Sequence, residues 1–194
     1  MAYRFILFVT IVQSILFLGH WFLYRTLTRF LGVANPSILL NLRVAMALLS
    51  VSLISTSILA HRYSDFSVRF LYTGAASWLG ILYLLILAAI PAWIIYEFVQ
   101  LFHLSLDRRL LVEILFGMAL LASLYGFINA GVIRVTRLSL QIPGLSSQWK
   151  GKTAVWVSDT HLGQVRNHGF AQQIATMVQN LHPDIVFIGG DLYD

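Results

Sequence analysis

The sequence predicts an α-helical membrane domain followed by the beginning of an α/β domain with the order strand, helix, strand. Three observations predict this class. Hydrophobic residues make up 58% of the 194 residues, mean hydropathy is +0.78, and only 11% of the residues are charged, against about 25% in ordinary soluble domains. Long apolar stretches fill most of the first 134 residues, which we take as the membrane domain. A more polar segment with a β-α-β pattern follows.

Each apolar stretch is expected to cross a bilayer as a helix, because a hydrocarbon core of about 30 Å requires roughly 20 apolar residues. We expect four spans, at about 5–24, 44–60, 70–99 and 110–133. The first follows Arg4 as a signal peptide would, but its length and the lack of a small-residue cleavage site favour an uncleaved helix. The third is longer than a span requires and contains Pro91, so tilt, a kink and an interfacial end all stay open.

Positive charge is concentrated in the membrane domain. Residues 1–140 hold ten basic and four acidic residues, whereas residues 141–194 hold three and four. No basic cluster is interleaved with aromatic residues on a polar element, so we expect contact with lipid headgroups and no nucleic-acid partner. The chain contains no cysteine, which excludes disulfide partners, thiolate metal sites and a cysteine nucleophile.

An even number of spans places both ends of the chain on the same side of the membrane. Basic residues flanking the spans are balanced between the two sides until Lys150 and Lys152 are added to the N-terminal side. The four spans predict a multi-pass integral membrane protein, which we place in the plasma membrane. The positive-inside rule then predicts that its C-terminal region lies in the cytoplasm.

Two polar sites near the spans have structural interpretations. His20 lies beside Trp21 and Tyr24, as expected of a residue in an interfacial aromatic belt. Glu113 follows Arg109 by one helical turn, which predicts an ion pair rather than a proton relay. No group of acids and bases in the spans indicates a transport path.

Residues 135–194 begin a second domain. The stretch "VIRVTRLSLQI" (132–142) alternates apolar and polar residues at the strand period, and "PGLSSQWKG" (143–151) supplies turn residues. "TAVWVSD" (153–159) is a short apolar run rich in residues that favour strands.

A helix and a second strand complete the pattern. One apolar stripe at helical spacing predicts an amphipathic helix over about 168–181; its members are Phe170, Ile174, Met177, Val178 and Leu181. "DIVFIGG" (184–190) is almost entirely apolar, which is typical of a strand buried on both faces of a parallel sheet.

Because a β-α-β crossover makes the strands parallel, their carboxyl ends meet at one edge of the sheet, where α/β proteins bind ligands. Asp159 and His161 follow the first strand, and Asp191 follows the second. In locally extended backbone, residues two apart point the same way, so the first two could address one ion. Gly189 and Gly190 remove side chains where the backbone must turn close to the site. Carboxylates with an imidazole suit Mn²⁺, Fe or Zn²⁺, whereas Ca²⁺ favours oxygen alone.

These residues carry a resemblance to a known family. "D-T-H" at 159–161 and "G-D-L-Y-D" at 190–194 resemble the first two signature blocks, D-x-H and G-D-x-x-D, of the calcineurin-like metallophosphoesterases. The preceding apolar helices are similar to the membrane-anchored branch, the transmembrane proteins with a metallophosphoesterase domain. The resemblance implies that Asp159 and His161 ligate one metal ion, that Asp191 bridges two, and that Asp194 supports the site.

The implied activity is hydrolysis of a phosphomonoester, phosphodiester or pyrophosphate by two divalent metal ions, with Mn, Fe and Zn as the candidates. A phosphorylated, lipid-linked substrate would suit a membrane enzyme. Two other interpretations stay open: an aspartyl phosphotransferase, and an unspecialised β-α-β unit in which Asp159 and Asp191 are turn residues. His168 and His182 fit no signature block, and no G-x-G-x-x-G motif indicates a dinucleotide site.

The sequence departs from the family after the second block. The later G-N-H-[DE] and G-H-x-H blocks, which supply further metal ligands and the general-acid histidine, do not occur in these residues. No catalytic acid is therefore assigned. We expect a truncated gene product or a fragmentary record, inactive by itself and with a loose C-terminal part. The alternative function is a catalytically inactive membrane-anchoring or regulatory remnant.

Overall fold

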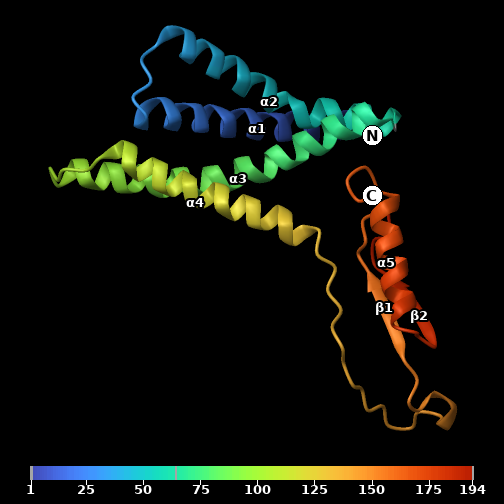
Figure 1. Ribbon diagram of the computed structural model, residues 1–194. Helices are drawn as coiled ribbons and strands as arrows, with labels where there is room; N and C mark the ends of the chain where they lie inside the picture. Colours follow the sequence, from blue (N-terminus) through green and yellow to red (C-terminus); the bar gives the residue numbers. More distant parts are fainter. Residues whose placement is uncertain (1, 64, 194) are drawn as a thin grey trace. The chain divides into compact units, whose positions relative to one another are not determined.

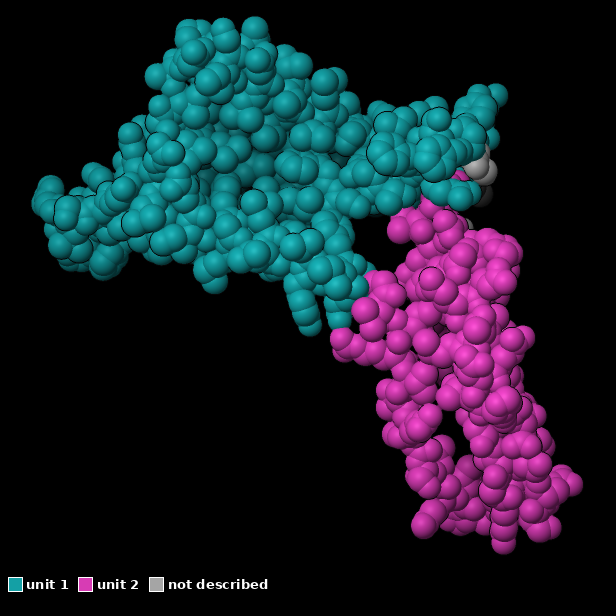
Figure 2. Space-filling view, in the orientation of Figure 1, with its two compact units in different colours: residues 1–130 teal, residues 131–194 magenta. Residues whose placement is uncertain are grey.

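The computed structural model describes residues 2–63 and 65–193. It divides into two compact units, residues 1–130 and residues 131–194 (Figure 2). Asp194, to which the family resemblance gives a supporting role, lies outside the described residues.

Four long helices make up the first unit (Figure 1). They are α1 (Ala2–Phe30), α2 (Pro36–Arg62), α3 (Phe66–Leu101) and α4 (Arg108–Ala130). Each is long and apolar enough to cross a membrane, and at most 22% of its most apolar stretch is buried inside the protein. Most apolar side chains therefore face outward, where lipid can solvate them. The four predicted spans are confirmed as membrane-length helices.

Short polar side chains cap the N-termini of three of these helices. Asn35 caps α2 by accepting from the backbone N–H two residues on at 2.9 Å, with Pro36 at the first helical position. Asp65 caps α3 by accepting from the N–H three residues on at 3.0 Å. Asp107 caps α4 by accepting from the N–H two residues on at 2.9 Å. Each cap satisfies a backbone donor that the helix leaves free, which explains why the helices begin there.

All four helices contribute to the core of the first unit, and its most deeply buried apolar side chains belong to α1, α3 and α4. Alanines at 89 and 92 are fully buried on α3, and their small side chains allow close approach of the neighbouring helices. Around them are large side chains with at most 2% of their surface exposed: Leu23 and Phe30 of α1, Leu82 of α3 and Val112 of α4.

His20 lies inside this unit, so the prediction that it belongs to an interfacial belt is wrong. Its side chain is 2% exposed. Its Nδ1 donates to the Leu16 carbonyl at 2.7 Å, and its Nε2 accepts from the Trp78 indole at 2.8 Å. The carbonyl can only accept and the indole can only donate, which defines the neutral Nδ1–H tautomer. These partners make its burial tolerable, because an unpaired polar group is costly among apolar helices.

The predicted pair of Arg109 and Glu113 is confirmed. Arg109 Nε donates to Glu113 Oε1 at 2.7 Å, one turn apart on α4. Both side chains are largely exposed, so the pair contributes little to stability.

Four membrane helices predict that both ends of the first unit lie on the same side of the membrane. A topology reporter fused before Arg4 and one fused after Lys150 should report the same compartment. A reporter inserted at Gly32, between α1 and α2, serves as the control and should report the opposite compartment. Opposite results for the two terminal fusions would rule out four spans.

The second unit contains a small parallel sheet and one helix (Figure 1). Its elements in order are the 3₁₀ turn Ser147–Trp149, β1 (Ala154–Ser158), α5 (His168–Asn180) and β2 (Ile185–Gly189). The strands pair from Ala154 opposite Ile185 to Ser158 opposite Gly189. The predicted order of strand, helix and strand is confirmed.

The strand-like alternation at 132–142 does not produce a strand. This segment has no regular secondary structure. A strand needs a neighbouring strand to satisfy its backbone groups, and among the described residues the sheet consists of β1 and β2 alone. The alternating pattern therefore has no partner in the described chain.

The two faces of the sheet have different surroundings. Val157, Val186 and Ile188 line an apolar cavity of about 340 Å³ together with side chains of α5. On the other face, the rings of Trp156 and Phe187 lie with centroids 6.2 Å apart and are 68% and 45% exposed. Val186 and Ile188, on the face toward α5, are nevertheless 42% and 65% exposed, so the described residues leave both faces of the sheet partly open. The burial on both faces that the apolar sequence of the second strand predicts is not found among them.

An ion pair joins the segments that lead into the strands. Lys152 Nζ donates to one carboxylate oxygen of Asp184 at 2.7 Å, and the Thr153 backbone N–H donates to the other at 2.8 Å. These two donors, the ammonium first, hold the pKa of the Asp184 carboxyl below its usual value. The pair therefore stabilises the fold above the unfolded-state pKa, and the effect is lost as pH falls through the lowered value. Because both groups are exposed, the contribution is small.

Candidate metal centre

The segments that follow β1 and β2 lie side by side at the carboxyl edge of the sheet. Both strands end at the same register position. Beyond it, the pairing continues through backbone hydrogen bonds: Asp159 N to Gly189 O at 3.3 Å, His161 N to Asp191 O at 3.1 Å, and Leu162 N to Leu192 O at 2.9 Å. The structure therefore brings the two motif-bearing segments together, as the β-α-β pattern predicts.

The backbone at the first motif is not extended, and the predicted reason for its alignment is wrong. Asp159 and His161 have φ angles of +53° and +46°. Thr160 between them is 6% exposed, and its Oγ1 donates to the Leu192 carbonyl at 2.9 Å. This buried threonine ties the loop to the neighbouring segment. The loop turns here rather than continuing the alternation of the strand.

Gly190 allows the carboxylate of Asp159 to lie against the second loop. Its φ is +66°, and a Cβ added here would overlap that carboxylate. In its place, Asp159 Oδ1 accepts from the Asp191 backbone N–H at 3.4 Å. Gly190 therefore stands at a turn that lies against Asp159, as predicted, while the metal site there stays a prediction.

Gly189 has a different role from the one predicted. A Cβ at this position would meet the Trp156 ring at 2.5 Å. Trp156 lies on the face of the sheet away from α5, so this glycine makes room for an indole and not for the loop that carries Asp159.

The side chains of Asp159, His161 and Asp191 are exposed. Two carboxylates and an imidazole are suitable donors for Mn²⁺, Fe or Zn²⁺. Within residues 2–63 and 65–193, however, no three histidine, aspartate or glutamate side chains lie close enough to hold a metal ion. The backbone brings the three residues to one edge without gathering their donor atoms, and the ligand set stays a prediction.

The remaining histidines of this unit lie outside the two loops. His168 is the first residue of α5 and is exposed. His182 follows α5 with a φ of +46° and is also exposed. Both positions agree with the interpretation that neither histidine belongs to a signature block.

Sequence reasoning missed two residues that hold the first loop. Thr160 is the first, through its buried hydroxyl. The second is Arg166, whose Nη1 donates to the Thr160 carbonyl at 3.3 Å and whose guanidinium lies 5.1 Å from the centroid of the Phe170 ring. No sequence signal distinguishes either residue, because their role depends on how the loops fold back on each other.

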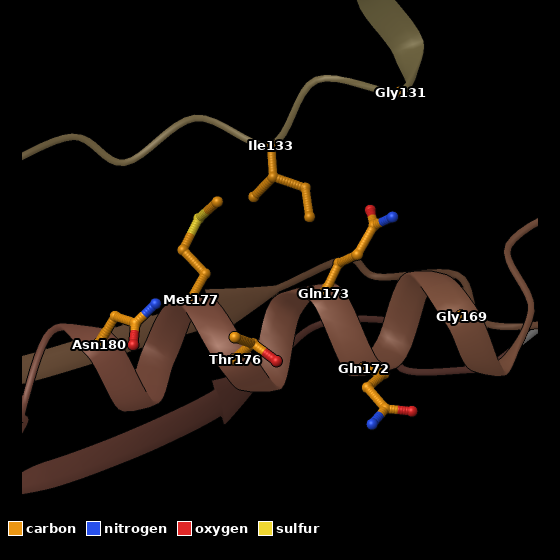
Figure 3. Close-up of a pocket in the computed structure, with 8 residues that line it drawn as sticks. All are labelled: Gly131, Ile133, Gly169, Gln172, Gln173, Thr176, Met177 and Asn180. Atoms are coloured by element: carbon orange, nitrogen blue, oxygen red, sulfur yellow. The ribbon is translucent and has the colours of Figure 1, made fainter.

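A separate open cavity of about 600 Å³ lies between the residues that follow α4 and one side of α5 (Figure 3). Ile133 and Met177 face each other across it. The other lining residues are uncharged: Gly131, Gly169, Gln172, Gln173, Thr176 and Asn180. The lining supplies no acid, base or metal ligand, so this cavity is not the metal centre.

Comparison with known proteins gives a partial match. The chain is 36% identical over 73 residues to "Transmembrane protein with metallophosphoesterase domain" of Danio rerio. The similarity is to one part of a longer protein. The match covers 37% of this chain and 17% of the Danio rerio protein. No protein-family model and no solved structure matches the chain. Together with the four membrane-length helices, this similarity supports an integral membrane protein.

Proposed function

We propose that this chain carries part of a membrane-bound, metal-dependent phosphoesterase that hydrolyses a phosphomonoester, a phosphodiester or a pyrophosphate. The observation that carries the proposal is the pairing of the two loops at the carboxyl edge of the sheet, where His161 N donates to Asp191 O at 3.1 Å. The partial identity to a metallophosphoesterase-domain protein points to the same chemistry.

In this proposal, Asp159 and His161 would hold one of two divalent ions, and Asp191 would be shared by both. Bound ions of this kind polarise phosphoryl oxygens and supply hydroxide near neutral pH. The chain's own contribution is to position the ligands. Thr160 ties the first loop to the second, and Gly190 leaves room for the Asp159 carboxylate.

The membrane helices support a substrate held at or near the bilayer. A domain anchored by four spans can reach a lipid-linked phosphate or pyrophosphate at the surface of the bilayer. We therefore propose a lipid-linked substrate. We also propose that the protein lies in the plasma membrane and, from the distribution of basic residues, that its site faces the cytoplasm.

Removal of metal tests this function. The complete gene product, meaning the protein expressed from its whole coding sequence, is purified in detergent. It should hydrolyse an aryl phosphodiester or phosphomonoester, and EDTA should reduce the rate to that of buffer. Mn²⁺, Fe²⁺ and Zn²⁺, added back separately, should restore the rate to different extents and so identify the ion. Hydrolysis that survives complete chelation would contradict the proposal.

The second candidate is a membrane-anchoring or regulatory role without catalysis. It is favoured by the lack of a three-residue metal group among the described residues. Failure of every added ion to produce hydrolysis by the complete gene product would support this role over the enzyme.

A further inference from the structure

An exposed apolar segment follows the last membrane helix. We call residues 134–150 the juxtamembrane segment. One short 3₁₀ turn is its only regular secondary structure, and the rest is coil. Leu138 and Leu140 are 78% and 76% exposed, and three further apolar side chains are at least 42% exposed: Val135, Ile142 and Trp149. Such a concentration of exposed apolar side chains marks an interaction surface.

The charge of this segment has one sign. It contains Arg134, Arg137 and Lys150, and the chain has no acidic residue between Glu113 and Asp159. Basic residues mixed with exposed leucine and tryptophan complement a surface that is negatively charged outside and apolar beneath. A protein surface of that description would need acidic residues around an apolar groove, whereas an anionic bilayer presents both features everywhere.

The covalent connection places the segment at such a surface. Helix α4 is a membrane-length helix that ends at Ala130. The segment begins four residues later, and an extended chain advances at most about 3.6 Å per residue. Its first residue therefore lies within about 14 Å of the end of α4. The segment starts in or beside the headgroup layer.

We propose that the juxtamembrane segment lies on the membrane and binds anionic phospholipids, with its apolar side chains inserted among the headgroups. Leu138, Leu140 and Trp149 enter the interface, while Arg137 and Lys150 contact the phosphates. This surface is separate from the loops of the candidate metal centre and does not depend on the proposed activity. It anchors the beginning of the second unit in addition to the four helices.

A single label tests the proposal, because the chain contains no cysteine. The Leu140→Cys variant of the full 194-residue chain is labelled with the environment-sensitive fluorophore NBD and placed in lipid nanodiscs. Nitroxide-labelled headgroups should quench this probe strongly in discs that contain about 30% phosphatidylserine and weakly in discs of phosphatidylcholine alone. Replacing Arg137 and Lys150 by glutamine should lower the ratio of membrane-bound to released segment, read from the quenching of the probe at 140, about fivefold for each charge removed.

The Gln172→Cys variant is the matched control, since residue 172 is an exposed polar position on α5. A probe there should be quenched equally and weakly in both kinds of disc. Three results would overturn the proposal. If the emission of the probe at 140 is that of NBD in water, the segment is solvated. If the emission is that of NBD in an apolar environment but the nitroxides do not quench it, protein and not lipid covers the segment. Equal strong quenching in both lipids shows that anionic headgroups are not recognised.

Discussion

Replacing Asp191 by asparagine is expected to lower metal-dependent phosphoester hydrolysis by the complete gene product at least about 100-fold. Loss of a residue that only hydrogen-bonds to a metal ligand typically lowers metal affinity or activity about 10–100-fold. Loss of a ligand that two ions share should lower them further. Asparagine keeps the size of the side chain and the backbone N–H that donates to Asp159 at 3.4 Å. The loop pairing should therefore survive while the negative charge is lost.

Two measurements accompany this variant. Its metal content after purification, determined by elemental mass spectrometry, should fall with its activity, and its elution from a size-exclusion column in detergent should be unchanged. His168→Ala is the control, because His168 is exposed at the start of α5 and outside both loops. Equal losses of activity and metal in the two variants would mean that the metal centre lies elsewhere.

Replacing Gly190 by alanine is expected to reduce both metal content and hydrolysis, the latter by about 100-fold, although it adds only a methyl group. The new Cβ would overlap the Asp159 carboxylate, which must move away. A misplacement of about 1 Å in a catalytic group can cost about 100-fold in rate. The positive φ of +66° adds a conformational cost of about 1–2 kcal/mol.

Gly144→Ala separates these two effects. Gly144 has a φ of +78°, close to that of Gly190, but a Cβ there would meet no atom within 4 Å. Both variants should show the conformational cost in thermal unfolding, and only Gly190→Ala should lose metal and activity. If Gly144→Ala loses as much activity as Gly190→Ala, backbone strain rather than the contact with Asp159 explains the result.

Several features of this protein were predictable from local sequence. The four helices follow from apolar stretches of sufficient length, because insertion of a helix into a bilayer depends more on its length and total hydrophobicity than on detailed packing. The β-α-β unit follows from one amphipathic stripe between two apolar runs. The meeting of the two motif segments follows from the parallel crossover, since topology alone brings the carboxyl ends of the strands to one edge.

Other features depended on neighbours that are distant in sequence. His20 has an interfacial local context, yet Trp78 of another helix accommodates it inside the membrane unit. Gly189 and Gly190 are adjacent, but one makes room for Trp156 and the other for Asp159. The alternation at 132–142 forms no strand, because strand formation depends on hydrogen bonds to a partner and not on the pattern alone.

The candidate metal centre shows the same division. Sequence determined which residues stand at the edge of the sheet: Asp159, His161 and Asp191. Only the tertiary structure decided how the first loop is held, through the buried hydroxyl of Thr160 and the positive φ angles on either side of it. A residue's type and spacing determine which chemistry it can contribute. Its orientation is decided by side-chain and backbone contacts between segments about 30 residues apart, which a local pattern does not contain.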